Sequence, residues 1–186
     1  MRVIVFDVEI MHSVEACGGW PAARRGECGV STVVLWDSED DRPHIYGEEN
    51  IDLCMEHLNK ADMLVSFNGK NFDVPCLEGY TGIGIEVSQH FDILDKIWKA
   101  LGSKPKGWGL GKVCERTLGL TKSDVGEHAP ALAEQGHWAT LIDYCLNDVY
   151  ITKKLFFHIA LTGYVIGPDG EQVFIEAPGE LTNVLW

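Results

Sequence analysis

The first nine residues hold the feature that most constrains the fold, a short apolar run that ends in two acids. Residues 2–6 are mostly β-branched, and their apolar positions are continuous rather than alternating. That pattern is typical of a strand buried on both faces of a sheet, with helices on either side. Asp7 and Glu9 continue the run with Val8 between them, so their side chains share one face of the expected strand.

Two neighbouring carboxylates at the end of a buried strand need something to compensate their charge. Burying them unpaired is strongly unfavourable or forces one of them to take up a proton. A divalent cation such as Mg²⁺ removes that cost, because it prefers carboxylate and water oxygens as ligands. The alternative is that the strand ends here and water solvates both acids.

The rest of the chain predicts an α/β fold. We predict strands at residues 30–36, 43–46, 63–67 and 87–91, helices at 51–58, 75–80, 93–101, 110–118 and 136–160, and a hairpin at 164–166 and 173–175. Three strands in a meander, followed by alternating helices and strands, indicate a mixed sheet flanked by helices. Residues 121–133 are assigned no element. We expect residues 1–163 to form one domain and residues 164–186 to pack on it as a hairpin and tail.

Two further acids occupy positions where a buried charge would need a partner. Asp73 follows the strand at residues 63–67 and begins a helix. Ligands gather at strand ends in α/β sheets, although the helix dipole alone also favours an acid there. Asp148 lies inside the long helix, four residues after Tyr144 and on the same face. Apolar residues surround it on that face, so a metal or a nearby donor would have to balance its charge.

Basic residues are concentrated in one segment of an otherwise acidic chain. The net charge of −13 argues against a general coat of phosphate contacts, yet residues 96–122 hold seven Lys and Arg residues against one acid. Two tryptophans lie among these cations, a combination that single-strand binding uses. The segment is therefore a candidate for holding a nucleic-acid strand, with Trp108, Lys112 and Lys122 as contacts. The alternative is that its lysines only solvate two helices and a loop.

Cysteine spacing and hydropathy bear on the cellular setting. The six cysteines include no CxxC pair, so a zinc-ribbon site is excluded. No apolar stretch approaches the ~18 residues of a membrane span, and the apolar start is too short for a signal peptide. We expect a reduced, cytoplasmic, monomeric protein without a membrane partner.

Three short motifs resemble those of the DEDD exonuclease superfamily: Phe6-Asp7-Val8-Glu9, Asn68-x4-Asp73 and Tyr144-x3-Asp148. Tyrosine in the third motif is similar to the DEDDy branch, which includes the proofreading domains of family A and B DNA polymerases. Over residues 1–163 the chain most resembles predicted exonucleases of the YprB type, some of which are fused to helicases. The shorter matches are Gly18-Gly19-Trp20, Gly29-Val30-Ser31, Leu118-Gly119-x2-Lys122-Ser123, Tyr144-Cys145, Asp148-Val149 and Gly163-Tyr164.

The resemblance implies an RNase H-like fold and 3′→5′ exonuclease activity on single-stranded nucleic acid, with DNA favoured over RNA. It also implies two divalent cations, Mg²⁺ or Mn²⁺, and a helicase or polymerase as a partner. The four acids would hold the cations, with Asp7 between both ions, Glu9 and Asp148 on the side of the nucleophile, and Asp73 at the second ion.

Other residues receive supporting roles from the same resemblance. Tyr144, whose ordinary pKa is near 10, is expected to orient the attacking water rather than take its proton. Asn68 would contact the terminal sugar or hold the loop of the second motif, and Met11 and His12 would shape the substrate pocket. Ile10 replaces the threonine that usually follows the first-motif glutamate, so a hydroxyl near the terminal nucleotide is lost.

Three alternatives stay open at this point. An endonuclease or an RNase H-type ribonuclease would use the same metal chemistry, so the motifs do not separate them from an exonuclease. A non-catalytic nucleic-acid-binding module of the same fold predicts lost carboxylates, whereas all four are present. A fragment of a polymerase or helicase is a further alternative, although we expect the chain to be complete by itself.

Overall fold

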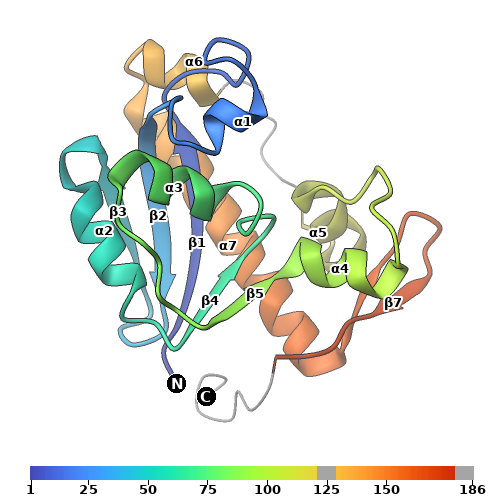
Figure 1. The fold of residues 1–186 in the computed structure, drawn as a ribbon. Coiled ribbons are helices and arrows are strands. Elements are labelled where there is room, and N and C mark those ends of the chain that lie inside the picture. The colour runs from blue at the N-terminus through green and yellow to red at the C-terminus, as the bar shows by residue number, and fades with distance from the viewer. Residues whose placement is uncertain (121–128, 179–186) are drawn as a thin grey trace.

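A computed structural model describes residues 1–120 and 129–178 of the chain. Its centre is a five-stranded sheet in the order β3-β2-β1-β4-β5 (Figure 1). β1, β2 and β3 are antiparallel neighbours, whereas β4 runs parallel to β1 and β5 parallel to β4. The predicted mixed sheet, an antiparallel meander extended by parallel strands, is therefore confirmed. The strands are β1 (Val3–Ile10), β2 (Val30–Asp37), β3 (Arg42–Gly47), β4 (Met63–Ser66) and β5 (Gln89–Asp92).

Helices cover both faces of the sheet because its central strand buries side chains on both. Val3 and Val5 pack in one core with α4 (Ile93–Leu101), α5 (Leu110–Leu118) and α7 (Trp138–Thr162). Ile4 and Phe6 pack in a second core with α2 (Ile51–Leu58) and α3 (Asp73–Thr81). In Figure 1, α2 and α3 lie in front of the sheet and α7 crosses behind it. The first apolar run is thus buried on both faces, as predicted.

The carboxyl half of β1 extends beyond its parallel neighbour. Pairing with β2 continues as far as Ile10, opposite Val30, whereas pairing with β4 runs from Val3 to Val5. β4 is shorter because it ends at Ser66, where the chain turns into the loop before α3. The two parallel strands therefore separate beside Asp7 and Glu9, and side chains from other elements can reach that position.

The structure shifts several boundaries and adds short helices. α1 (Trp20–Ala23) lies between the first two strands, where no element was predicted, and α6 (Ala129–Glu134) lies in the segment to which no element was assigned. A 3₁₀ turn, η1 (Glu48–Asn50), precedes α2. α7 begins two residues later than predicted and ends two residues later, before Gly163. No helix of the described residues is long and apolar enough to cross a membrane.

The predicted C-terminal hairpin is present as β6 (Tyr164–Ile166) and β7 (Gln172–Phe174), which pair in antiparallel fashion. It is fastened to α5 by two hydrogen bonds at Ile166. Arg116 Nε donates to the Ile166 carbonyl oxygen (3.2 Å), and the Ile166 N–H donates to Thr117 Oγ1 (3.0 Å). Val165 and Val173 of the hairpin join the core that contains α7.

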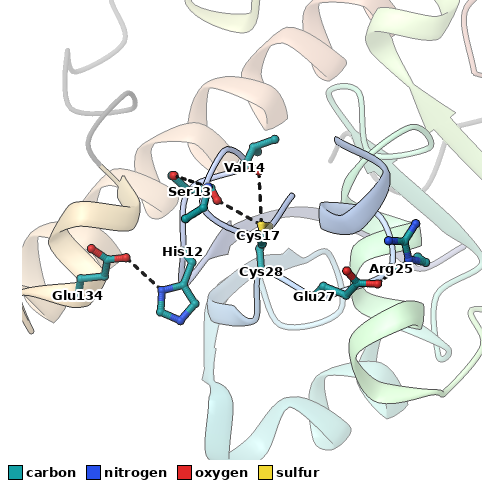
Figure 2. The surroundings of a disulfide bond; sticks show 9 residues. His12, Ser13, Val14, Cys17, Arg25, Glu27, Cys28 and Glu134 are labelled. Carbon is teal, nitrogen blue, oxygen red and sulfur yellow. Dashed lines mark hydrogen bonds and ion pairs between the residues drawn. A yellow bond between two sulfur atoms is a disulfide. The ribbon is translucent and has the colours of Figure 1, made fainter. Parts of the chain in front are cut away.

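Two of the six cysteines are paired, which differs from the expectation of a reduced protein. Cys17 and Cys28 form a disulfide with their Cα atoms 5.3 Å apart (Figure 2). Sequence spacing could not show this, because it depends on how the chain between β1 and β2 folds back on itself. A disulfide sulfur carries no proton, so the 3.2 Å approach of Cys17 Sγ to the Ser13 carbonyl is a hydrogen bond only in the reduced form. The remaining four cysteines are buried free thiols.

Candidate active site

Asp7 and Glu9 lie on the face of β1 that α7 covers, beside the point where β1 and β4 separate. Their partners across the antiparallel pair are Val34 and Thr32 of β2. Both carboxylates are half-buried. A carboxylate oxygen of each lies within 4.8 Å of the other and of the Cys145 sulfur. The two acids therefore share one small volume under α7, which excludes the alternative of a strand end with two separately solvated acids.

Asp73 joins this volume from the opposite side of the opening. It is the first residue of α3 and is 5% exposed. Its Oδ1 accepts the N–H of Val8 at 3.1 Å, a donor of β1 beyond the last pair with β4. Burial, together with the negative charges of Asp92 and Asp148, raises the pKa of Asp73 to about 7, although the backbone N–H groups of Asp73 and Val8 act to lower it. Asp73 thus serves as a side-chain bridge to β1 and also faces other acids.

The loop before Asp73 is held in shape by a buried acid that the sequence did not single out. Asp92, at the end of β5, is fully buried and accepts the N–H groups of Asn68 and Lys70, both at 2.9 Å. Asn68 has a φ of +72°, and its side-chain oxygen accepts from Asn71 Nδ2 at 3.2 Å. These contacts favour the loop-holding role for Asn68. The signal that could have found Asp92 is its place at the end of the neighbouring parallel strand.

Helix α7 brings Tyr144 and Asp148 to the same volume. Both are buried, at 5% and 3% exposure. The pKa of the Tyr144 hydroxyl lies well above its ordinary value, first because of burial and then because of the charges of Asp148, Glu9 and Asp7 and a hydrogen bond with Asp148. The phenol therefore keeps its proton and can act only as a hydrogen-bond donor or as a neutral acceptor near neutral pH.

Cys145 is a member of the site that sequence reasoning treated only as an apolar helix residue. Its sulfur lies 3.5 Å from both the carbonyl oxygen and Oδ2 of Asp7. Burial, followed by the charges of Asp7 and Glu9, raises the pKa of the thiol well above its usual value. The protonated thiol thus donates towards Asp7 and helps to fix its carboxylate. Its position three residues before Asp148, on the same helix face, is the signal that could have found it.

The donor set fits a divalent cation. Four carboxylates from β1, α3 and α7 approach one volume, and their charges contribute to the raised pKa values of Asp73 and Tyr144. Carboxylate oxygens are the ligands preferred by Mg²⁺ and Mn²⁺, and a positive charge would remove the repulsion. Asp7, Glu9, Asp73 and Asp148 are the residues that could hold such ions.

Comparison with known proteins gives the family. A family model of the RNase H superfamily matches residues 33–160. The chain belongs to the RNase H superfamily. The matched part contains Asp73, Tyr144 and Asp148, and it begins after Asp7 and Glu9, which the sheet brings to the same place. The RNase H-like fold and the superfamily together support a nuclease in general terms.

The fold of this chain is similar to part of a much longer protein of known structure. It is similar to the family B DNA polymerase from the hyperthermophilic archaeon Pyrobaculum calidifontis, with a TM-score of 0.65 and 18% sequence identity. The similarity covers 86% of this chain and 24% of the polymerase chain, so the chain spans about a quarter of that protein. At this identity the similarity shows the fold alone. No curated protein matches the chain.

Two predicted substrate contacts of this RNase H superfamily chain lie just beyond β1. The N–H groups of Met11 and His12 donate to Gly29 and Cys28, at 3.2 and 3.0 Å. Met11 lines a cavity of about 380 Å³ between β2, β3 and the start of α7. His12 is exposed and pairs with Glu134 of α6 at 3.0 Å (Figure 2). Both residues therefore follow β1 directly, Met11 beside this cavity and His12 at the surface.

The structure bears differently on the three substrate contacts predicted in the basic segment, Trp108, Lys112 and Lys122. The structure packs Trp108 into the core at 4% exposure, with the Arg116 guanidinium over its ring, so the prediction that Trp108 contacts substrate is wrong. Tryptophan among lysines is typical of a stacking surface in a sequence, but here the ring packs in the core with residues of α5. Lys112 lies on the exposed side of α5 and pairs with Glu115 at 3.5 Å. Lys122 lies outside the described residues.

Proposed function

We propose that this chain is a 3′→5′ exonuclease that hydrolyses phosphodiester bonds of single-stranded nucleic acid, DNA in preference to RNA. The proposal rests on one observation above all. Four carboxylates from three separate elements approach one volume at the opening between β1 and β4, with a protonated tyrosine among them. Such an arrangement is unstable by itself and becomes favourable when it binds cations that the reaction can use.

The four acids would hold two divalent cations, Mg²⁺ or Mn²⁺. When bound, such a pair supplies an activated water molecule and stabilises the departing oxygen of the cleaved bond. The resemblance to the DEDD exonucleases implies a place for Asp7 between both ions, and its carboxylate lies close to that of Glu9 and to the Cys145 thiol. Asp73 and Asp148 complete the set from α3 and α7.

Tyr144 would orient the attacking water. Its hydroxyl keeps its proton in this acidic surrounding, so it can hold a water molecule by hydrogen bonding but does not accept a proton from it. Removal of the proton would then depend on the charge of the cations. Direction of attack and strand preference rest on the resemblance of the Tyr144-x3-Asp148 motif to proofreading exonucleases. The similarity in fold to a family B DNA polymerase is consistent with that resemblance and with a polymerase or helicase as partner.

An endonuclease or an RNase H-type ribonuclease is the second candidate, and the superfamily match fits it as well as it fits an exonuclease. Both candidates use the same acids, so only the products separate them. An exonuclease requires a free 3′ end, whereas an endonuclease cleaves a circular strand.

A substrate panel tests both candidates. Single-stranded DNA, duplex DNA, RNA and an RNA–DNA hybrid, each labelled at the 5′ end, and an internally labelled circular single-stranded DNA are incubated with Mg²⁺, Mn²⁺ or EDTA. The proposal expects a ladder that shortens stepwise from the 3′ end of single-stranded DNA, no product in EDTA, and an intact circular strand. Cleavage of the circle, or of only the RNA strand in the hybrid, would favour the second candidate. Asp7→Asn is the control, because a contaminating nuclease would not respond to it.

A further inference from the structure

The segment between β1 and β2 forms a firm projection beside the loop that carries Asp73. The Cys17–Cys28 disulfide closes it (Figure 2), and α1 lies within it. It packs against α3 so closely that a Cβ on Gly26 would lie 2.3 Å from the Tyr80 nitrogen, and one on Gly79 would lie 2.4 Å from Arg25. In Figure 1, α1 is next to α3 at the carboxyl end of the sheet. The projection is therefore fixed relative to the candidate active site.

Trp20 is exposed at the start of α1. It is 56% exposed, whereas Trp36 and Trp108 are buried in the core. One edge of its ring meets Phe72, with ring centroids 5.7 Å apart and an interplanar angle of 82°. Phe72 directly precedes Asp73. The Trp20 indole is thus exposed and lies near Asp73, a candidate metal ligand. Its π-face is available to a base of the substrate strand.

Arg24 adds a cation to the same projection. It follows Trp20 by four residues, caps α1 and is exposed. Its Nε donates to the Asn71 carbonyl oxygen at 2.8 Å, so it is attached to the loop that leads to Phe72 and Asp73. That bond uses one of the five N–H groups of the guanidinium, and a phosphate can be bound through the others. The lysines of α4 and α5 are less suited to this task, since Lys96, Lys99 and Lys112 pair with acids.

We infer that Trp20 and Arg24 form a nucleotide-binding subsite, in which the indole stacks on a nucleobase and the guanidinium binds a phosphate of the strand being cleaved. The inference rests on the proposed function, because it presupposes a single strand that enters the site. An aromatic ring beside a cation is the combination by which proteins hold single strands without reading sequence. The subsite therefore favours unpaired over paired bases, because a base within a duplex has no free face for Trp20.

Binding and cleavage are measured separately to test the subsite. Affinity for a fluorescein-labelled single-stranded DNA is determined by anisotropy in Ca²⁺, and cleavage is followed in Mg²⁺ or Mn²⁺. Trp20→Ala is expected to weaken binding by about 10-fold, within the range of one stacked base, while Trp20→Phe retains most of the affinity. Arg24→Gln is expected to lower the slope of log K against log salt by about 0.7, the loss of one phosphate contact. Phe174→Ala, which removes a 69% exposed ring from β7, is the matched control and changes neither quantity.

An abasic residue, placed at each position of the strand in turn, shows whether the effect is stacking. At one position the wild type should lose as much affinity as Trp20→Ala loses, and the variant should lose nothing further. Equal losses for wild type and variant at every position would overturn the subsite. If Trp20→Ala unfolds, the comparison of Trp20→Phe with Trp20→Leu, which fills the contact with Phe72 but cannot stack, decides in its place. Binding that depends on Trp20 but is not followed by cleavage would overturn the proposed function and leave the subsite standing. Cleavage that is insensitive to Trp20 would overturn the subsite and leave the proposed function standing.

Discussion

Buried acids lie beside both ends of β1. The acid at the amino end is surrounded by basic side chains, whereas those at the carboxyl end are surrounded by other acids. At the amino end, Asp37 of β2 is 1% exposed, accepts from Arg2 Nε at 3.0 Å and pairs with His57 Nε2 at 2.7 Å. At the carboxyl end, Asp73 and Asp148 are almost as buried, and the charges that act on Asp73 come from other acids. Near the same sheet, therefore, one buried acid is neutralised by a side chain of the protein, Arg2, whereas a second group of acids repel each other.

The difference appears in the direction of the pKa shifts. Burial acts to raise the pKa of Asp37, but hydrogen bonds from Arg2, Glu39 and His57 outweigh it, so the pKa lies below its usual value. For Asp73, burial and neighbouring acids act in the same direction. Asp37 also lies within metal-binding distance of His44 and His57, yet Arg2 already occupies its carboxylate. A buried acid indicates an external cation only where the fold has not supplied one.

Asp7→Asn should produce the largest effect, because it removes a carboxylate that we place between both cations. We expect kcat for single-stranded DNA to fall by at least about 10³-fold, since bound metal contributes several kcal/mol and each 1.36 kcal/mol is tenfold. In EDTA the variant should be at least as stable as the wild type to heat, because one repelling charge is gone. Gel assays and calorimetry measure the two quantities. Unchanged Mn²⁺-dependent degradation would remove the site assignment altogether.

Addition of metal should stabilise the folded protein through the acids at the carboxyl end of β1 and not through Asp37 at its amino end. At a Mn²⁺ concentration of 100 times Kd, binding is expected to add about 3 kcal/mol to the free energy of unfolding, a rise in Tm of roughly 5–10 °C for a chain of this size. Asp148→Asn should abolish most of this rise. Asp37→Asn is the matched control and should retain it. A rise that disappears in Asp37→Asn instead would place the metal at the wrong end of the strand.

Asp37→Asn should act on stability and leave activity alone. It leaves Arg2 and His57 without their shared carboxylate, and we expect a loss of about 2 kcal/mol. This is below the cost for a fully buried pair, because the Arg2 side chain is 21% exposed and retains Glu39 at 2.7 Å. Urea denaturation measures the loss, and cleavage rates below the transition should match the wild type. A variant that loses activity while folded would show that the two ends are coupled.

Sequence alone predicted the architecture well, because its signals are local. The continuous run at residues 2–6 is buried on both faces of β1, and the strand at residues 63–67 lies parallel beside it. Hydrophobic periodicity reports which face of an element is buried, and that is sufficient for layers and order. Boundaries moved where caps decide them, as at α7, whose end at Gly163 depends on a left-handed residue rather than on apolar spacing.

The candidate site was only partly predictable, because its remaining members contact it through space. Three motifs predicted Asp7, Glu9, Asp73, Tyr144 and Asp148, whereas Cys145 and Asp92 lie outside those motifs and were overlooked although their positions on the helix and at the strand end could have indicated them. Trp108 misled because its basic neighbours are exposed while its ring fills the core. Trp20 and the Cys17–Cys28 pair depend on how one loop folds back, and no periodic pattern records that path.

The last prediction concerns pH, and its sign is opposite at the two ends of β1. In EDTA, Asp73 keeps its proton in the folded state up to about pH 7, while the unfolded chain releases it near pH 4. Stability linked to Asp73 is therefore complete below about pH 4 and is lost as the pH rises from there through about 7. The depressed pKa of Asp37 gives the reverse, with stability lost only as the pH falls below about 4. Urea midpoints from pH 3 to pH 8 test this: Asp73→Asn should flatten the curve above pH 4, whereas Asp37→Asn should flatten only the fall below pH 4. Mn²⁺ should reverse the slope in the wild type, because it binds the ionised carboxylates; a curve that ignores both Asp73→Asn and Mn²⁺ would mean that the acids at the carboxyl end do not act as one group.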